Sequence, residues 1–126
     1  MGLTPLDGIP MGTRSGNLDP AVLQYMSKQA GYSIDEMLQI LNKESGYLGI
    51  SGVANDSRDL EEQMATNERC RLALDLQFKR IADYIGSYYV YMKGVDAIVF
   101  TAGIGENSKN MRKSVLDRVS VLGVKV

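Results

Sequence analysis

The sequence predicts an α/β domain that is rich in helix, has few strands and holds only part of its sheet. Apolar residues recur at helical spacing in several segments, most clearly over residues 68–93. Only one run, residues 96–101, combines β-prone composition with the length of a buried strand. Such a strand needs neighbours to satisfy its backbone N–H and C=O groups. We therefore expect the other strands to lie outside these 126 residues and the chain to be a piece of a longer protein.

Composition limits the classes of function. The chain has 126 residues, of which 44% are hydrophobic and 23% are charged, as in one ordinary globular domain. Its formal net charge of -1 gives no general reason to bind nucleic acid or an anionic membrane. The sequence shows no secretion signal and no long uncharged apolar stretch. We expect neither nucleic-acid nor membrane partners, so a bound anion must be held by a local device.

The absence of histidine removes the commonest general base and metal ligand. The single cysteine, Cys70, stands between Arg69 and Arg71, and cationic neighbours can activate a thiol. A Cys/His nucleophile is nevertheless impossible here, so we interpret Cys70 as an unreactive helix residue. One cysteine also excludes an intramolecular disulfide and is compatible with a reducing cytosol.

The first part of the chain predicts a loop and two helices. The first 17 residues contain four glycines and two prolines, too many for regular structure. Asp19 followed by Pro20 predicts the start of a helix, and Gly31 predicts its end. Ser33 and Glu36 have the spacing of a capping box, which predicts the start of the second helix.

Further helices follow. A glycine-rich segment over residues 44–60 predicts a loop that leads into a short helix over residues 58–65. A long amphipathic helix is expected over residues 68–93. It carries four tyrosines that we interpret as packing at the rim of a core rather than a base-stacking surface: Tyr84, Tyr88, Tyr89 and Tyr91. After the strand and a glycine turn, we expect a helix over residues 108–118, and residues 119–126 are again β-prone.

Two clusters contain an arginine that can bind an anion. In MGTRSGN, Arg14 stands between Gly12 and Gly16, so the backbone can approach a ligand while the guanidinium offers fixed donors to an oxyanion. The alternative is an exposed solubilising arginine. In VANDSRD, Asp56 caps a helix start, and Arg58 is either solvated or a contact for a nucleotide.

The third cluster is VFTAGIGENS, residues 99–108, which reads as a strand, a Gly-x-Gly turn and a helix start. In α/β folds this order presents free amides to phosphate or ribose. The third glycine of a dinucleotide fingerprint and the Gly-Lys-Ser/Thr of a Walker loop are both missing. Glu106 also places a negative charge where a pyrophosphate would lie. The residues therefore favour a site for the less charged end of a nucleotide.

Taken together, MGLTPLDG, MGTRSGNLDP, SGVANDSRDL and VFTAGIGENS resemble, in this order and spacing, the C-terminal half of the acetate kinases. The resemblance covers essentially the whole chain. It implies that residues 1–126 are part of the C-terminal domain, a partial ribonuclease H-like (actin-like ATPase) fold, without the N-terminal domain. It also implies a cytoplasmic, homodimeric parent that transfers the γ-phosphoryl group of ATP reversibly to acetate, giving acetyl phosphate and ADP, with Mg²⁺.

The resemblance also implies roles for single residues. Arg14 matches the catalytic arginine that contacts the transferring phosphoryl group, and Pro5 matches a wall of the acetate pocket. The implied nucleotide contacts are Asp56, Ser57, Arg58, Gly103, Ile104, Gly105, Glu106 and Asn107. The family's Mg²⁺ ligands belong to segments outside this chain, so we expect no metal ligand here and no activity from the 126 residues alone. Ser57 and Asn17 depart from the residues usual in the family.

Two other interpretations stay open. A propionate or butyrate kinase would share these motifs and would differ in pocket residues that are mostly missing from this chain. A helical interaction module without catalysis would use the long amphipathic helix as a docking face, and its glycines would serve only as turns.

Overall fold

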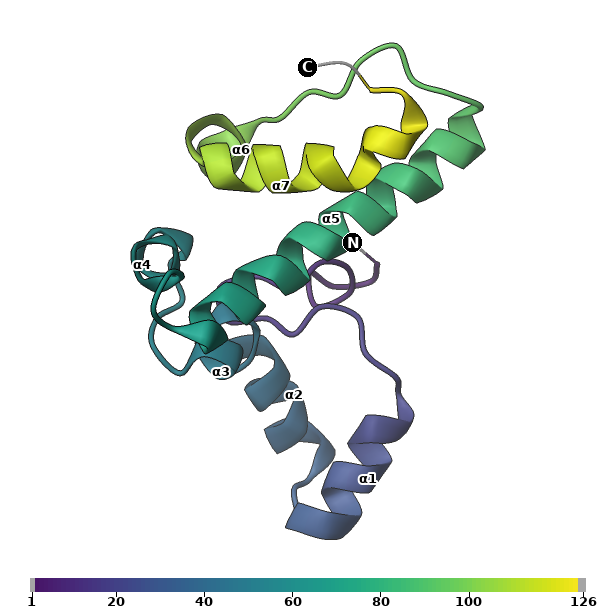
Figure 1. The fold of residues 1–126 in the computed structure, drawn as a ribbon. Coiled ribbons are helices and arrows are strands. Elements are labelled where there is room, and N and C mark those ends of the chain that lie inside the picture. The colour runs from purple at the N-terminus through teal and green to yellow at the C-terminus, as the bar shows by residue number, and fades with distance from the viewer. Residues whose placement is uncertain (1, 125–126) are drawn as a thin grey trace. The chain divides into compact units, whose positions relative to one another are not determined.

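The computed structural model describes residues 2–124, which form helices joined by loops (Figure 1). In chain order these are α1 (Ala21–Ala30), α2 (Ile34–Lys43), α3 (Gly46–Ser51), α4 (Ser57–Gln63), α5 (Glu68–Met92), α6 (Ala102–Asn107), α7 (Lys109–Val119) and the 3-10 helix η1 (Ser120–Leu122). Residues 2–124 contain no β-strand, and none of their helices is both long and apolar enough to cross a membrane. The chain divides into two compact units, Met1–Asp75 and Leu76–Val126.

Short-range contacts hold both ends of α1 (Ala21–Ala30) and the start of α2, at helix boundaries close to those that the sequence predicts. Asp19 accepts a hydrogen bond from the Ala21 amide at 2.9 Å, and Gly31 ends α1 with a φ of 75°. At the start of α2 the Glu36 amide donates to the Ser33 hydroxyl at 3.3 Å, and the Ser33 amide donates to the Glu36 carboxylate at 2.8 Å. This backbone hydrogen bond, with a second one from the hydroxyl, lowers the pKa of Glu36. The predicted capping box is therefore confirmed.

The sequence does not predict α3, because its glycines indicate a loop. The helix is six residues long and ends at Gly52, which has a φ of 70°. The predicted helix over residues 58–65 is observed as α4, and the long helix α5 ends one residue before the predicted 68–93.

The core of the first unit comes from α2 to α5. Its buried apolar residues are Met37, Tyr47, Leu60, Cys70, Ala73 and Leu74. The arginines beside Cys70 bind other groups, since Arg69 Nε donates to the Ile50 carbonyl at 2.7 Å and Arg71 pairs with Glu68 at 3.2 Å. The burial of Cys70 agrees with its interpretation as an unreactive helix residue.

In the second unit, the strand predicted over residues 96–101 is not formed. The segment is extended, but the backbone groups of residues 95–100 make no hydrogen bond to another described residue. The physical reason is that residues 2–124 offer no partner strand. The β-prone end of the chain also differs from expectation, because Ser120–Leu122 form η1, while residues 125 and 126 lie outside the described part.

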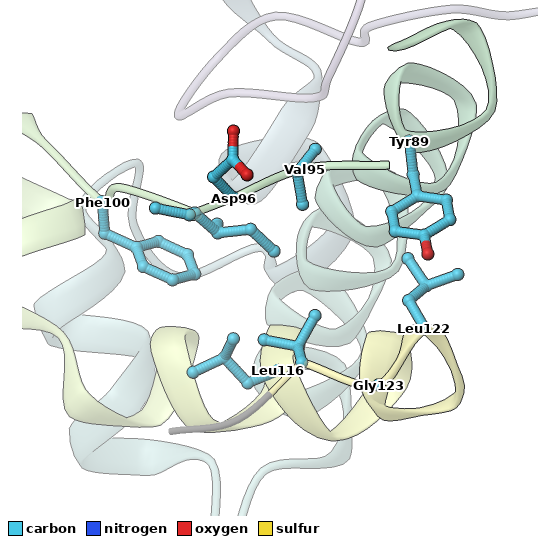
Figure 2. Close-up of a pocket in the computed structure, with 10 residues that line it drawn as sticks. Tyr89, Val95, Asp96, Phe100, Leu116, Leu122 and Gly123 are labelled. Carbon is cyan, nitrogen blue, oxygen red and sulfur yellow. The ribbon is translucent and has the colours of Figure 1, made fainter. Parts of the chain in front are cut away.

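The extended segment borders an open cavity of about 510 Å³ in the second unit (Figure 2). The apolar residues that line it include Ile98 and Phe100 of the segment, Tyr89 of α5, Leu116 of α7 and Leu122 of η1. Val99, on the alternate face of the segment, is 77% exposed. Apolar residues on both faces are typical of a strand that helices cover on both sides. The composition is thus that of a strand, although no strand forms here.

The last helix of the chain is close to its prediction. The sequence predicts residues 108–118, and α7 is displaced from this range by one residue at each end. The Ser108 hydroxyl caps it by accepting a hydrogen bond from the Met111 amide at 3.0 Å. Met111, Val115 and Val119 form its buried face.

Two backbone hydrogen bonds close the C-terminal end of α5 in the pattern of a Schellman motif. The Lys93 amide donates to the Val90 carbonyl at 3.2 Å, and the Gly94 amide donates to the Tyr89 carbonyl at 2.9 Å. Lys93 itself has a left-handed φ of 60°. Glycine adopts this conformation without the steric cost that a Cβ brings.

We expect Lys93→Gly to raise the melting temperature of the chain, because removing the left-handed strain stabilises the fold by about 1 kcal/mol. Far-UV circular dichroism during heating measures the melting temperature. The control, Lys79→Gly in the middle of α5, lowers the melting temperature, because glycine inside a helix costs about 1 kcal/mol. A lower melting temperature for Lys93→Gly contradicts the prediction.

Candidate functional site

The loop that carries Arg14 is held on the junction between α2 and α3. Three amides of the junction donate to three successive loop carbonyls, each at 2.9 Å: Tyr47 to Met11, Leu48 to Gly12 and Ser45 to Thr13. The Ser15 amide donates to the Leu41 carbonyl, also at 2.9 Å. Because these bonds lie on both sides of Arg14, the fold fixes the backbone from which its side chain leaves.

Two glycines let the loop come this close. A Cβ on Gly46 would meet the carbonyl oxygens of Met11 and Arg14, and Gly46 has a φ of 59°. A Cβ on Gly12 would meet the carbonyl oxygen of Asn55. Since Asn55 belongs to VANDSRD, the first unit brings this motif and MGTRSGN into contact.

Among residues 2–124, Arg14 is the arginine whose guanidinium makes no hydrogen bond or ion pair with an oxygen atom. Its hydrogen-bond partner is Met11 Sδ, 3.5 Å from Nη1, and the side chain is half-buried. The other arginines bind carboxylate, carbonyl or hydroxyl oxygens: Arg58, Arg69, Arg71, Arg80, Arg112 and Arg118. A thioether is a weak acceptor. Most of the donor capacity of Arg14 is therefore available to a ligand.

Asp56 and Arg58 form an ion pair at the start of α4. Asp56 Oδ1 accepts from the Arg58 amide at 2.9 Å, and Oδ2 accepts from the guanidinium Nη2 at 2.6 Å. The side-chain hydrogen bond from Arg58, followed by the backbone one, lowers the pKa of Asp56 to about 2. Both carboxylate oxygens are engaged, so a ligand of Arg58 must share the guanidinium with Asp56 or displace it.

Tyr47 of α3 is a buried titratable residue in the same unit. Burial raises its pKa, and the negative charges of Glu61 and Asp56 raise it further. Its phenol stays protonated at ordinary pH and cannot act as a general base there.

In the second unit, the predicted glycine turn is itself a short helix, α6. Its first residue, Ala102, has a φ of 60°. Gly105 is buried, and a Cβ there would lie 3.2 Å from the Phe100 carbonyl carbon. Ser108 ends α6 and caps α7, so the two helices follow each other directly. The expectation of a non-helical turn is wrong, because the carbonyls at the end of α6 find donors that the sequence pattern does not show.

The residues expected at the site fall in both units. Pro5, Arg14, Asp56, Ser57 and Arg58 lie in the first, and Gly103, Ile104, Gly105, Glu106 and Asn107 lie in the second. Pro5 is in an exposed loop, and of residues 103–107 all but Gly105 are exposed. Asn17 braces the Arg14 loop, because its Oδ1 accepts from the Gly8 amide at 2.5 Å.

Gly46 and Arg112 are the residues that the sequence analysis misses. Gly46 supports the Arg14 loop, and Arg112 Nη1 donates to the carbonyls of Gly105 and Glu106 at 2.9 and 2.6 Å. Neither has a local signal, because Gly46 meets residues far away in the sequence and Arg112 reaches across a helix boundary.

The whole chain, residues 1–126, matches the sequence profile of the acetokinase family, and the chain belongs to that family. Acetate kinase from Acholeplasma laidlawii (strain PG-8A) is 61% identical over 127 residues, which is 100% of this chain and 32% of that protein. Acetate kinase from Finegoldia magna is 56% identical, again over 100% of this chain and 32% of that protein. The chain thus spans about a third of the length of the curated relatives it matches.

Solved structures with similar sequences share the fold. A propionate kinase from Francisella tularensis has a TM-score of 0.93 and 45% identity over 97% of this chain and 32% of that chain. Porphyromonas gingivalis acetate kinase has a TM-score of 0.93 and 41% identity over 98% of this chain and 31% of that chain. The resemblance to the acetate kinases is confirmed.

We expect the Asp56 carboxyl to titrate with a pKa of about 2, and Arg58→Gln to raise that pKa toward 3.8. Carbon NMR of the side-chain carboxyl during an acid titration measures both values. Since the pKa is lowered in the folded state, the contribution of the pair to stability is complete above 3.8 and is lost as the pH falls through about 2. Arg71→Gln is the control and leaves the Asp56 pKa unchanged; an equally unchanged value in Arg58→Gln refutes the assignment.

We expect Gly46→Ala to destabilise the chain more than Gly52→Ala does. Both glycines have left-handed backbone, with φ of 59° and 70°, but nothing lies within 4 Å of a Cβ on Gly52. Gly52→Ala should cost about 1 kcal/mol from backbone strain. Gly46→Ala should cost about 1–3 kcal/mol more, because the Met11 and Arg14 carbonyls must move. Urea unfolding measures both costs, and equal values contradict the close approach.

Proposed function

We propose that this chain is part of an acetate kinase, which transfers the γ-phosphoryl group of ATP reversibly to acetate and gives acetyl phosphate and ADP. The relatives that match the chain over its whole length carry the name acetate kinase, which supports the proposal. The observation that carries it is Arg14, a half-buried guanidinium on a fixed loop with no oxygen partner among residues 2–124. Such a group is suited to bind phosphoryl oxygens.

Arg14 is the proposed catalytic arginine. Phosphoryl transfer spreads negative charge over the equatorial oxygens of the transferring group, and cationic donors stabilise that charge. The guanidinium plane can present two parallel N–H donors to two oxygens. Because the backbone on both sides of Arg14 is hydrogen-bonded, little reorganisation is needed when the charge develops. Pro5, in the same unit, is proposed to line the acetate pocket.

Two segments are proposed to bind the nucleotide. In the first unit these residues are Asp56, Ser57 and Arg58, with Arg58 oriented by Asp56. In the second unit they are Gly103, Ile104, Gly105, Glu106 and Asn107 of α6. This helix contains no lysine or arginine and exposes Glu106, so it suits adenosine rather than the phosphates.

Kinases of this class use ATP together with Mg²⁺. No group of three or more acidic or cysteine side chains among residues 2–124 is placed to hold a metal ion, so the residues present do not fit that role. We assign no step through the metal. We further propose that the chain corresponds to part of the C-terminal domain of a cytoplasmic, homodimeric parent, and that the 126 residues alone are inactive.

A propionate kinase is the second candidate, because the Francisella tularensis structure of that name is 45% identical to the chain. Acetate and propionate differ by one methylene, which a pocket discriminates by about 1–3 kcal/mol. The ratio of kcat/KM for the two acids, measured on the full-length parent protein, separates the candidates. The helical interaction module remains the alternative from a different class.

The test is a graft of residues 1–126 into the Acholeplasma laidlawii acetate kinase, in place of the matching 127 residues. We propose that the graft forms acetyl phosphate from ATP and acetate and that the isolated chain forms none. A folded graft that neither turns over nor binds ATP contradicts the kinase assignment and favours the interaction module.

We expect Arg14→Ala in the graft to lower kcat by about 10³-fold, because an arginine at the transferring phosphoryl group contributes that much in related chemistry. Arg14→Lys should recover only a small part, since an ammonium group cannot bind two oxygens in one plane. Lys28→Ala, an exposed substitution on α1, is the control and keeps the parent rate. Turnover of Arg14→Ala equal to that of Lys28→Ala excludes the catalytic role.

A further inference from the structure

The end of α6 depends on a side chain from the next helix. α6 has six residues and contains two glycines. An isolated helix of this length is unstable in water, and glycine lowers helix stability further. Something outside the helix must therefore hold it.

Three of the last four carbonyls of α6, those of Ile104, Gly105 and Glu106, accept a hydrogen bond from a residue beyond the helix. Asn107 Nδ2 donates to the Gly103 carbonyl at 2.8 Å, and the Ser108 amide donates to the Ile104 carbonyl at 3.0 Å. Arg112 Nη1 donates to two further carbonyls, of Gly105 at 2.9 Å and of Glu106 at 2.6 Å. The C-terminal carbonyls of a helix have no partner within the helix, so these donors replace the missing hydrogen bonds.

Arg112 is the strongest of these donors. Its hydrogen bonds are charge-assisted, and a cation at the C-terminal end of a helix is favoured by the helix dipole. The side chain is half-buried and leaves from the first turn of α7, whose own start is fixed by the Ser108 cap. Arg112 thus ties α6 to a longer helix with a buried apolar face.

We propose that Arg112 is a positioning residue for nucleotide binding: it holds α6 in the conformation in which residues 103–107 contact the adenosine, without touching the nucleotide itself. The inference rests on the proposed nucleotide role of α6. It assigns a further arginine to the same site, with a task different from that of Arg14. Arg14 acts on the reacting group, whereas Arg112 acts through the backbone carbonyls of Gly105 and Glu106.

The first experiment uses the chain itself, without nucleotide. Hydrogen–deuterium exchange is compared for the parent chain, Arg112→Met, Arg112→Lys and the control Lys113→Met. Lys113 neighbours Arg112 on α7 but pairs with Asp117 at 2.6 Å on the exposed side. We expect the amides of residues 103–108 to exchange about tenfold faster in Arg112→Met, since a hydrogen bond from a charged group contributes roughly that factor or more. Arg112→Lys should restore part of the protection, and Lys113→Met should change nothing there.

The second experiment places the same variants in the graft and separates KM from kcat. We expect Arg112→Met to raise KM for ATP about tenfold, while KM for acetate and kcat stay within about twofold of the parent values. Arg112→Lys should recover most of the ATP affinity. Loss of a purely structural contact would instead lower kcat or the yield of folded protein. It would not raise KM for ATP while leaving KM for acetate unchanged.

The outcomes are distinct. Faster exchange of α6 together with a selective rise in KM for ATP supports the positioning role. Unchanged exchange in Arg112→Met overturns it, whatever the graft does. Faster exchange with an unchanged KM for ATP also overturns it, because α6 would then be loosened without any effect on the nucleotide. If the parent graft does not bind ATP, the proposed kinase function is wrong. The exchange data from the chain then describe only the order of α6, and the nucleotide role of Arg112 is wrong as well.

Discussion

The hydrogen bonds between residues 11–15 and the junction of α2 and α3 are the constraint on which the first unit depends. The amides at the start of a helix have no partner within it, and in α3 the carbonyls of the Arg14 loop supply one. One set of bonds therefore caps a helix and shapes a loop at the same time. Neither part can move alone, and a Cβ at position 46 would disturb both.

The fold is predictable from the sequence where short-range contacts decide it. The caps of α1, α2 and α7 follow from Asp19, Ser33 and Ser108, each of which bonds an amide within one turn. The length of α5 follows from its apolar spacing. α3 and α6 are not predictable in this way, because their glycines indicate turns. The partners of α3 lie in residues 11–13, and α6 is held in part by Arg112 of the next helix. For residues 96–101 the sequence predicts an element that the structure lacks. Their composition favours a strand, but pairing needs a second strand that residues 2–124 do not contain.

In the candidate site, too, the sequence predicts some features and only the structure shows the others. Sequence identifies Arg14 and Arg58 as cations in glycine- or aspartate-containing loops, and the two look alike at that level. The structure distinguishes them, because Asp56 holds Arg58 with both carboxylate oxygens while Arg14 meets only a thioether. The Asp-x-Arg spacing permits such a pair but does not fix its geometry. The role of Arg112 depends on the turn between two helices, which no periodic pattern encodes.

Ala102 gives the start of α6 a property that glycine would not. Its left-handed φ of 60° costs an alanine about 1 kcal/mol relative to glycine. Gly103 and Gly105 already make this segment permissive, and a third glycine would widen the range of conformations it visits when no ligand is present. The alanine narrows the range of backbone conformations and adds a small strain to the left-handed one. At a left-handed position this strain outweighs the entropy that the alanine removes from the alternative conformations, so contacts elsewhere in the second unit must hold the start of α6 in place.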